Sequence, residues 1–287
     1  MTAPQHSRVA PPRRASWWTG PAHLGGYFVA TLGWFLVLGV VVAALIIARG
    51  QPIEATTADL SFLGAWVPVL TGVQQLGMLA IAAVGAVFVG WSDPGPLRAR
   101  VQHNLGMTSA TVAALAVAAG LGLTAGQPGS WLSDRFLERY DWAPMVVDLI
   151  GDALGRGGFE AVTMAITVGL LAPVCEELIF RGYLWSAFER SAPPWVALVV
   201  TSSVFAAYHL DPPQVIGVVP IAFVLGWVRW HTGSVWPGVV MHVVNNTFAL
   251  AIAAWVPGAS EMATPWWMAA GGTLLTLAGM GVVVRRA

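Results

Sequence analysis

The chain has 287 residues, of which 56% are hydrophobic and only 10% are charged, and its mean hydropathy is +0.69. An ordinary soluble domain carries roughly 25% charged residues, so this composition leaves too few charges to cover a water-facing surface. The formal net charge is zero, which gives no indication of a nucleic-acid partner. The single cysteine, Cys175, excludes an internal disulfide. The composition therefore predicts an integral membrane protein whose solvent is the lipid bilayer.

Apolar stretches follow one another along the chain. A spanning helix needs about 20 apolar residues, and stretches near this length lie at 27–48, 66–91, 105–125, 158–188, 195–211, 214–230, 235–256 and 265–284. The fourth is long enough to protrude or kink. The fifth and sixth are short and are separated by Asp211-Pro212-Pro213, which breaks a helix. We expect an all-α fold, a polytopic transmembrane helix bundle with about eight spanning helices.

Two segments are predicted to lie outside the bilayer. Residues 1–24 are polar and basic and form a predicted cytoplasmic tail, which leaves 25–287 as one transmembrane domain. The loop 126–157 alternates apolar and charged residues at helical spacing, which predicts an amphipathic helix in the interface.

The distribution of arginine indicates the orientation, because cytoplasmic segments are enriched in basic residues. With the N-terminus inside, the inner segments contain Arg8, Arg13, Arg14, Arg98, Arg100, Arg190, Arg229, Arg285 and Arg286. The outer segments contain Arg49, Arg135, Arg139 and Arg156. We expect both termini in the cytoplasm of a bacterial cell.

The fourth apolar stretch contains three charged residues, which are costly within a bilayer unless they are paired or functional. Glu177 and Arg181 are one helical turn apart and should form an ion pair. Glu176 is rotated by about 100° from Glu177, so it points elsewhere and has no local arginine. Such a carboxylate is a candidate general base; the alternative is a structural ion pair beside an interfacial carboxylate.

Two further polar pairs lie on later stretches. Phe205 and His209 are one turn apart, so the phenyl ring could hold the imidazole in place. His242 and Asn246 are also one turn apart and could both donate hydrogen bonds to a developing oxyanion. Taken alone, each pair is equally compatible with hydrogen bonds between helices.

Distances along the helices indicate whether these groups can meet. At 1.5 Å per residue, Glu176 and His209 both lie about 21 Å from the cytoplasmic ends of their helices. The segment from His242 to Asn246 lies roughly 11–17 Å deep. The sequence therefore predicts similar depths for the first two groups and leaves a gap to the third.

In this order, the motifs Glu176-Glu177-x-x-x-Arg181, Phe205-x-x-x-His209 and His242-x-x-x-Asn246 resemble the signature of the CAAX prenyl protease and bacteriocin-processing family. This family, abbreviated CPBP and also called Abi, comprises intramembrane metalloproteases. The resemblance covers residues 158–256. It implies a transmembrane protease domain that cleaves a peptide bond of a membrane-associated or C-terminally lipidated protein or peptide.

The resemblance also implies roles for the motif residues. Glu176 and His209 would activate the attacking water, and His242 and Asn246 would stabilise the oxyanion. Glu177 and Arg181 would hold the site together, or Glu177 would share the acid–base work.

Two questions stay open at this stage. Glu176, His209 and His242 could ligate a divalent metal such as zinc and leave one open position, or they could activate water without a metal. The alternative function is a membrane transporter or channel in which buried Glu, His and Arg side chains line an ion path.

Overall fold

The computed structural model describes residues 15–48, 66–91, 93–142, 145–256, 258 and 262–286. Within these ranges the regular elements are all helical, as expected. In chain order they are α1 (Thr19–Ala48), α3 (Val67–Phe88), α4 (Leu97–Asn104), α5 (Val112–Thr124), α6 (Gln127–Arg139), α7 (Met145–Arg156), α8 (Gly158–Ile166), the π-helix η2 (Thr167–Leu171), α9 (Ala172–Glu177), the π-helix η3 (Leu178–Leu184), α10 (Trp185–Glu189), α11 (Pro194–Ala207), α12 (Pro212–Thr232), α13 (Trp236–Trp255) and α14 (Trp266–Arg286).

Seven helices in the described part of the chain are long and apolar enough to span a membrane. They are α1, α3, α5 together with α6, the continuous segment from α8 to α10, α12, α13 and α14. The remaining predicted span, 195–211, is the apolar helix α11, which has only 14 residues. The chain is therefore an integral membrane protein.

The structure differs from the predicted boundaries in three places. Helix α1 begins at Thr19 rather than Tyr27, and residues 1–14 of the predicted tail lie outside the described residues. The predicted span 105–125 begins only at Val112, the first residue of α5, and α6 prolongs it to Arg139. The predicted interfacial helix 126–157 is consequently divided between α6 and α7.

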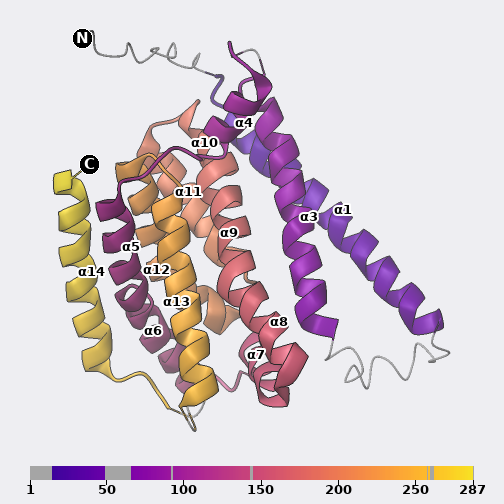
Figure 1. The fold of residues 1–287 in the computed structure, drawn as a ribbon, viewed down its shortest axis with the longest axis vertical. Coiled ribbons are helices and arrows are strands. Elements are labelled where there is room, and N and C mark those ends of the chain that lie inside the picture. The colour runs from indigo at the N-terminus through magenta and orange to yellow at the C-terminus, as the bar shows by residue number, and fades with distance from the viewer. Residues whose placement is uncertain are drawn as a thin grey trace.

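The segment from α8 to α10 is the central helix of the bundle. In its most apolar window 56% of the residues are buried, against 12% in α1. Helices α1 and α3 pack on one side of it, and α11, α12 and α13 pack on the other (Figure 1). A residue buried on all sides within the membrane must satisfy its polar groups inside the protein.

The central helix contains two π-helical stretches, η2 and η3. Pro173 is the second residue of α9, the helix that follows η2. It lacks an N–H donor, and its ring crowds the preceding turn. A π-turn closes its hydrogen bonds at i→i+5, so it holds more residues and rises less per residue than an α-turn. The bend predicted for this long apolar stretch therefore takes the form of widened turns.

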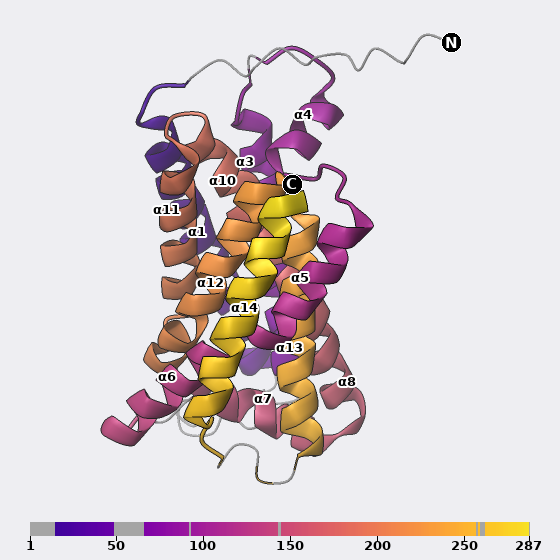
Figure 2. The same ribbon diagram turned by 90° about the vertical axis from the view of Figure 1, so that its left-hand side faces the viewer.

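Helices α6 and α12 cross with their backbones in contact. A Cβ atom added to Gly129 would collide with the carbonyl oxygen of Gly217. Small residues at such crossings allow close approach of helices in membranes. In Figure 2, α6 passes beside the lower half of α12, where this contact holds the two together.

We predict that Gly129→Ala destabilises the protein by about 1–3 kcal/mol, because the two helices must separate to admit one methyl group. The thermal midpoint of the purified protein in detergent would measure this loss. Gly120→Ala is the matched control, because a Cβ at this position on α5 meets nothing within 4 Å. Equal midpoints for the two variants would contradict the assigned contact.

Candidate active site

The central helix positions two adjacent carboxylates in the interior of the bundle. The exposed fraction is 6% for Glu176 and 0% for Glu177. The expected ion pair is present: Arg181 Nη1 donates to Glu177 Oε1 at 3.0 Å, and both side chains are fully buried. The Nη2 group of Arg181 donates to the carbonyl oxygen of Ala222 on α12 at 2.8 Å. The guanidinium therefore joins η3 to a neighbouring helix as well as to Glu177.

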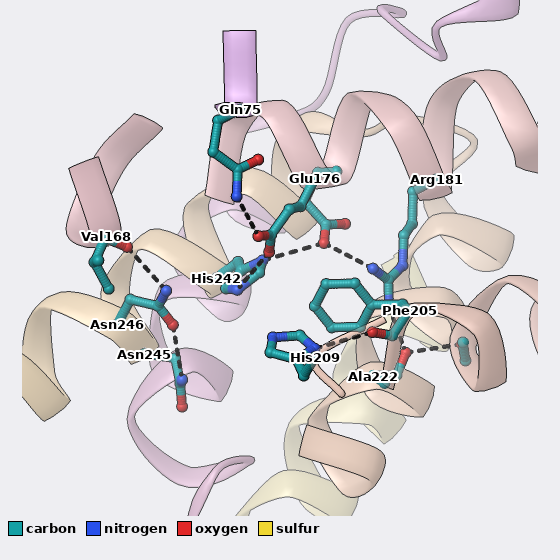
Figure 3. Close-up of polar contacts among 12 residues, drawn as sticks. Gln75, Val168, Glu176, Arg181, Phe205, His209, Ala222, His242, Asn245 and Asn246 are labelled. Carbon is teal, nitrogen blue, oxygen red and sulfur yellow. Dashed lines mark hydrogen bonds and ion pairs between the residues drawn. The ribbon is translucent and has the colours of Figure 1, made fainter. Parts of the chain in front are cut away.

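Helix α13 places His242 against both carboxylates (Figure 3). Its Nδ1 lies 3.3 Å from Glu177 Oε1, and its Nε2 lies 3.8 Å from Glu176 Oε2. Among the described residues Glu176 forms no ion pair with an arginine, as its position on the helix predicted. One imidazole ring nevertheless reaches the carboxylates of both residues.

This contact also closes the predicted gap in depth between the first and third motifs. The estimate from sequence used the α-helical rise for the whole distance from Glu176 to the end of the central helix. Much of that distance is η3, which rises less per residue. Glu176 therefore lies nearer the helix end than estimated, which accounts for part of the gap to His242.

Phe205 is the common neighbour of the polar groups. Its ring makes edge contacts with His209 and His242, with centroid distances of 5.1 and 5.6 Å. The guanidinium carbon of Arg181 lies 4.4 Å from the centre of the same ring. Phe205 therefore separates His209 from the ion pair and limits how each imidazole can turn.

His209 lies in the turn that follows α11, where the chain reverses direction. Its Nδ1 lies 3.0 Å from the carbonyl oxygen of Phe205. A carbonyl oxygen can only accept, so Nδ1 carries the proton and Nε2 is free to accept one. The next residue, Leu210, has a φ of 60°, a left-handed conformation that is strained for a leucine. Asp211 accepts a hydrogen bond from the Trp142 indole at 2.9 Å.

Asn246 lies one turn below His242 and contacts η2. Its Nδ2 donates to the carbonyl oxygen of Val168 at 3.0 Å. Its Oδ1 accepts from Asn245 Nδ2 at 3.2 Å. The amide is therefore held in one orientation, with a second N–H that these bonds do not use. Asn245, which lies on a different face from His242, is the residue that orients Asn246.

One residue of the site was missed from the sequence. Gln75 on α3 donates from Nε2 to Glu176 Oε1 at 3.0 Å, and its exposed fraction is 5%. The available signal was a pair of glutamines, Gln74 and Gln75, in the middle of an apolar helix. Polar residues within a spanning helix are candidates for function, but nothing in the sequence indicated their partners.

The three candidate metal ligands do not form a ligand set. No group of three His, Cys, Asp or Glu side chains that could hold a metal occurs in the part of the chain that the structure describes. Glu176 and His242 are adjacent, but the Phe205 ring packs against both His242 and His209 and keeps the two imidazoles apart. The donors present do not fit a preformed zinc centre.

The fold is that of an integral membrane protein with a Glu/His arrangement buried in its interior. Residues 158–248 match the family described as type II CAAX prenyl endopeptidase Rce1-like. The motif-bearing segment is therefore similar to this family of peptidases, in agreement with the resemblance of its motifs.

A curated bacterial protein shows a similarity of the same kind. The chain is 25% identical over 92 residues to "Putative membrane peptidase YdiL" of Bacillus subtilis (strain 168). The similarity covers 32% of this chain and 38% of the relative, so the chain aligns with less than half of that protein's length. No solved structure gives a significant match.

We predict that Glu177→Ala destabilises the protein by about 3–5 kcal/mol, because it leaves the fully buried Arg181 without its carboxylate. The free energy of unfolding in detergent would measure the loss. Glu138→Ala is the matched control: it removes the carboxylate of an exposed pair with Arg135, which is worth at most about 1 kcal/mol. Similar losses in the two variants would contradict a buried structural role for Glu177.

Proposed function

We propose that this chain is an intramembrane endopeptidase that hydrolyses a peptide bond of a membrane-associated or C-terminally lipidated protein or peptide. The observation that carries the proposal is the pair formed by Glu176 and His242. Their side chains lie within 3.8 Å of each other in the interior of an integral membrane protein. Both residues belong to the segment that matches a CAAX endopeptidase family.

Glu176 is the proposed general base, and its Oε2 is the atom that takes the proton. The other oxygen, Oε1, already accepts a hydrogen bond from Gln75. The 3.8 Å between Oε2 and His242 Nε2 is too long for a direct hydrogen bond. A water molecule that contacts both atoms would be oriented for attack and for loss of a proton to the carboxylate. His209, through its free Nε2, shares this proton transfer.

Hydrolysis then proceeds in two steps. The water oxygen forms a bond to the carbonyl carbon of the substrate, and its proton moves to Glu176. The N–H groups of His242 and Asn246 stabilise the negative charge on the carbonyl oxygen. The proton then moves to the amide nitrogen, the C–N bond breaks, and the amine leaves.

Glu177 and Arg181 hold this arrangement in place. Glu177 Oε1 accepts from both Arg181 and His242, so it fixes the imidazole relative to the central helix. His242 faces Glu176 with Nε2, which is the ring atom proposed to donate to the oxyanion.

The proposed reaction uses only groups of the protein and water. A divalent ion remains an alternative activator that a chelator tests directly, because Glu176 and His242 could contribute two ligands. The proposed surroundings are the bacterial cell membrane and a peptide or membrane-protein substrate.

We predict that purified wild-type protein cleaves members of a peptide library that includes prenylated C-terminal peptides. Glu176→Gln should abolish cleavage, because the amide cannot take the proton from water, and His209→Ala should reduce or abolish it. Product analysis by mass spectrometry measures both effects, and a parallel reaction with a chelator tests for a metal.

The control for folding is the thermal midpoint of each variant, which should match that of the wild type within a few degrees. Cleavage by Glu176→Gln at the wild-type rate would rule out the proposed base. If neither protein cleaves any peptide, while reconstituted wild type moves a solute across vesicles and Glu176→Gln does not, the transporter alternative replaces the peptidase.

We also propose that residues 25–287 act as one domain with both termini in the cytoplasm. The start of α1, helix α4, the α10–α11 and α12–α13 junctions and the end of α14 lie at one end of the bundle, and α7 lies at the other (Figure 1). The first group includes Arg98, Arg100 and Arg190, which supports this orientation. Arg229 supports it less, because it is buried and donates to the Arg181 carbonyl.

Labelling of introduced cysteines tests the orientation. In intact cells, Asp141→Cys, beyond α6, should react with a membrane-impermeant maleimide, whereas Ser109→Cys, before α5, should react only after the cells are opened. The single native cysteine, Cys175, is fully buried and should give little background. The reverse pattern would contradict cytoplasmic termini.

A further inference from the structure

Helix α3 lies outside the segment that matches the peptidase family, yet it contributes to the site. Two adjacent glutamines, Gln74 and Gln75, interrupt its apolar sequence. An amide within a spanning helix is costly unless it is hydrogen-bonded. Both amides donate to residues close to the proposed catalytic groups, so their partners indicate what they do.

Within the described residues, the Gln75 amide makes one hydrogen bond, and its partner is Glu176. Its Nε2 donates to Oε1 at 3.0 Å, from the side opposite His242 (Figure 3). Both side chains are at least nine-tenths buried, so water does not compete strongly for this bond. The bond fixes the plane of the carboxylate and leaves Oε2 directed toward His242.

Other contacts hold α3 against the rest of the protein. Gln74 Nε2 donates to the hydroxyl of Tyr208 at 3.0 Å. Thr167 in η2 donates to the carbonyl oxygen of Pro68 at 3.2 Å. Because these bonds are independent of Gln75, the helix does not need Gln75 for its position. The bond to Glu176 therefore acts on the carboxylate rather than on the packing of the helix.

We propose that Gln75 is a positioning residue that orients the Glu176 carboxylate for proton transfer, an inference that rests on the proposed peptidase function. Its amide suits both states of the carboxylate. The N–H, which donates to Oε1 of Glu176 in the structure, is the partner that an ionised carboxylate needs. The buried Oε1 of Gln75 has no hydrogen-bond partner among the described residues. Rotation of the amide lets this oxygen accept from the protonated form of Glu176.

Steady-state kinetics of the full-length protein in detergent test the proposal, with a peptide that the wild type cleaves. Gln75→Met keeps the length of the side chain but removes the donor. It should lower kcat by about 10- to 100-fold, as expected for a misplaced catalytic group, and change KM by less than about twofold. Gln75→Asn keeps the amide on a shorter side chain and should recover part of kcat.

Leu76→Ala is the matched control, because Leu76 is the neighbouring residue of α3 and is 52% exposed. It should leave kcat and KM at the wild-type values. The thermal midpoints of Gln75→Met and Leu76→Ala should lie close to that of the wild type, which separates positioning from folding.

Three results would overturn the proposal. Gln75→Met with the wild-type kcat would show that the hydrogen bond has no role in the reaction. A fall in kcat that Gln75→Asn does not relieve, accompanied by a lower thermal midpoint, would show that Gln75 serves packing alone. If the wild type cleaves no peptide, the reaction in which Gln75 acts is absent, and the proposed function fails with it.

Discussion

The buried ion pair between Glu177 and Arg181 is the constraint on which the rest of the site depends. Two charges within a spanning helix are tolerated only if their hydrogen-bonding groups are satisfied by the protein. Arg181 bonds to Glu177 and the carbonyl oxygen of Ala222 and lies over the face of the Phe205 ring. Its buried Nε has no hydrogen-bond partner among the described residues. Glu177 in turn accepts from His242. The cost of burying one pair of charges thus determines the positions of three neighbouring helices relative to the central one.

The same network explains why the two glutamates can have different roles. Glu177 is committed to a cation and an imidazole and has no exposed surface. Gly238 on α13 lies so close that an added Cβ would be 2.8 Å from its Oε2. Glu176 has an amide on one oxygen and an imidazole beside the other, and no arginine. A carboxylate without a fixed counter-ion is the one suited to exchanging a proton.

Much of this arrangement could be predicted from spacing alone. Residues four apart share a helix face, which indicated the ion pair between Glu177 and Arg181 and the contact of Phe205 with His209. The depth of His242 relative to Glu176 could not be predicted, because apolar sequence gives no signal for the π-turns of η3. The bond from Gln75 was equally unpredictable, since it joins residues 101 positions apart. Predicting it requires knowledge of which helices are neighbours.

The π-helical stretch η3 also affects how this chain should be compared with its relatives. Each π-turn accommodates one residue more than the α-turn it replaces. A relative with a regular α-helix here would need fewer residues to travel from its counterpart of Glu177 to its counterpart of Trp185. An alignment without a gap would then pair Trp185, which is fully buried, with a residue on another face. The motif residues can be aligned correctly while the residues after them are paired with positions that are rotated by a fraction of a helical turn.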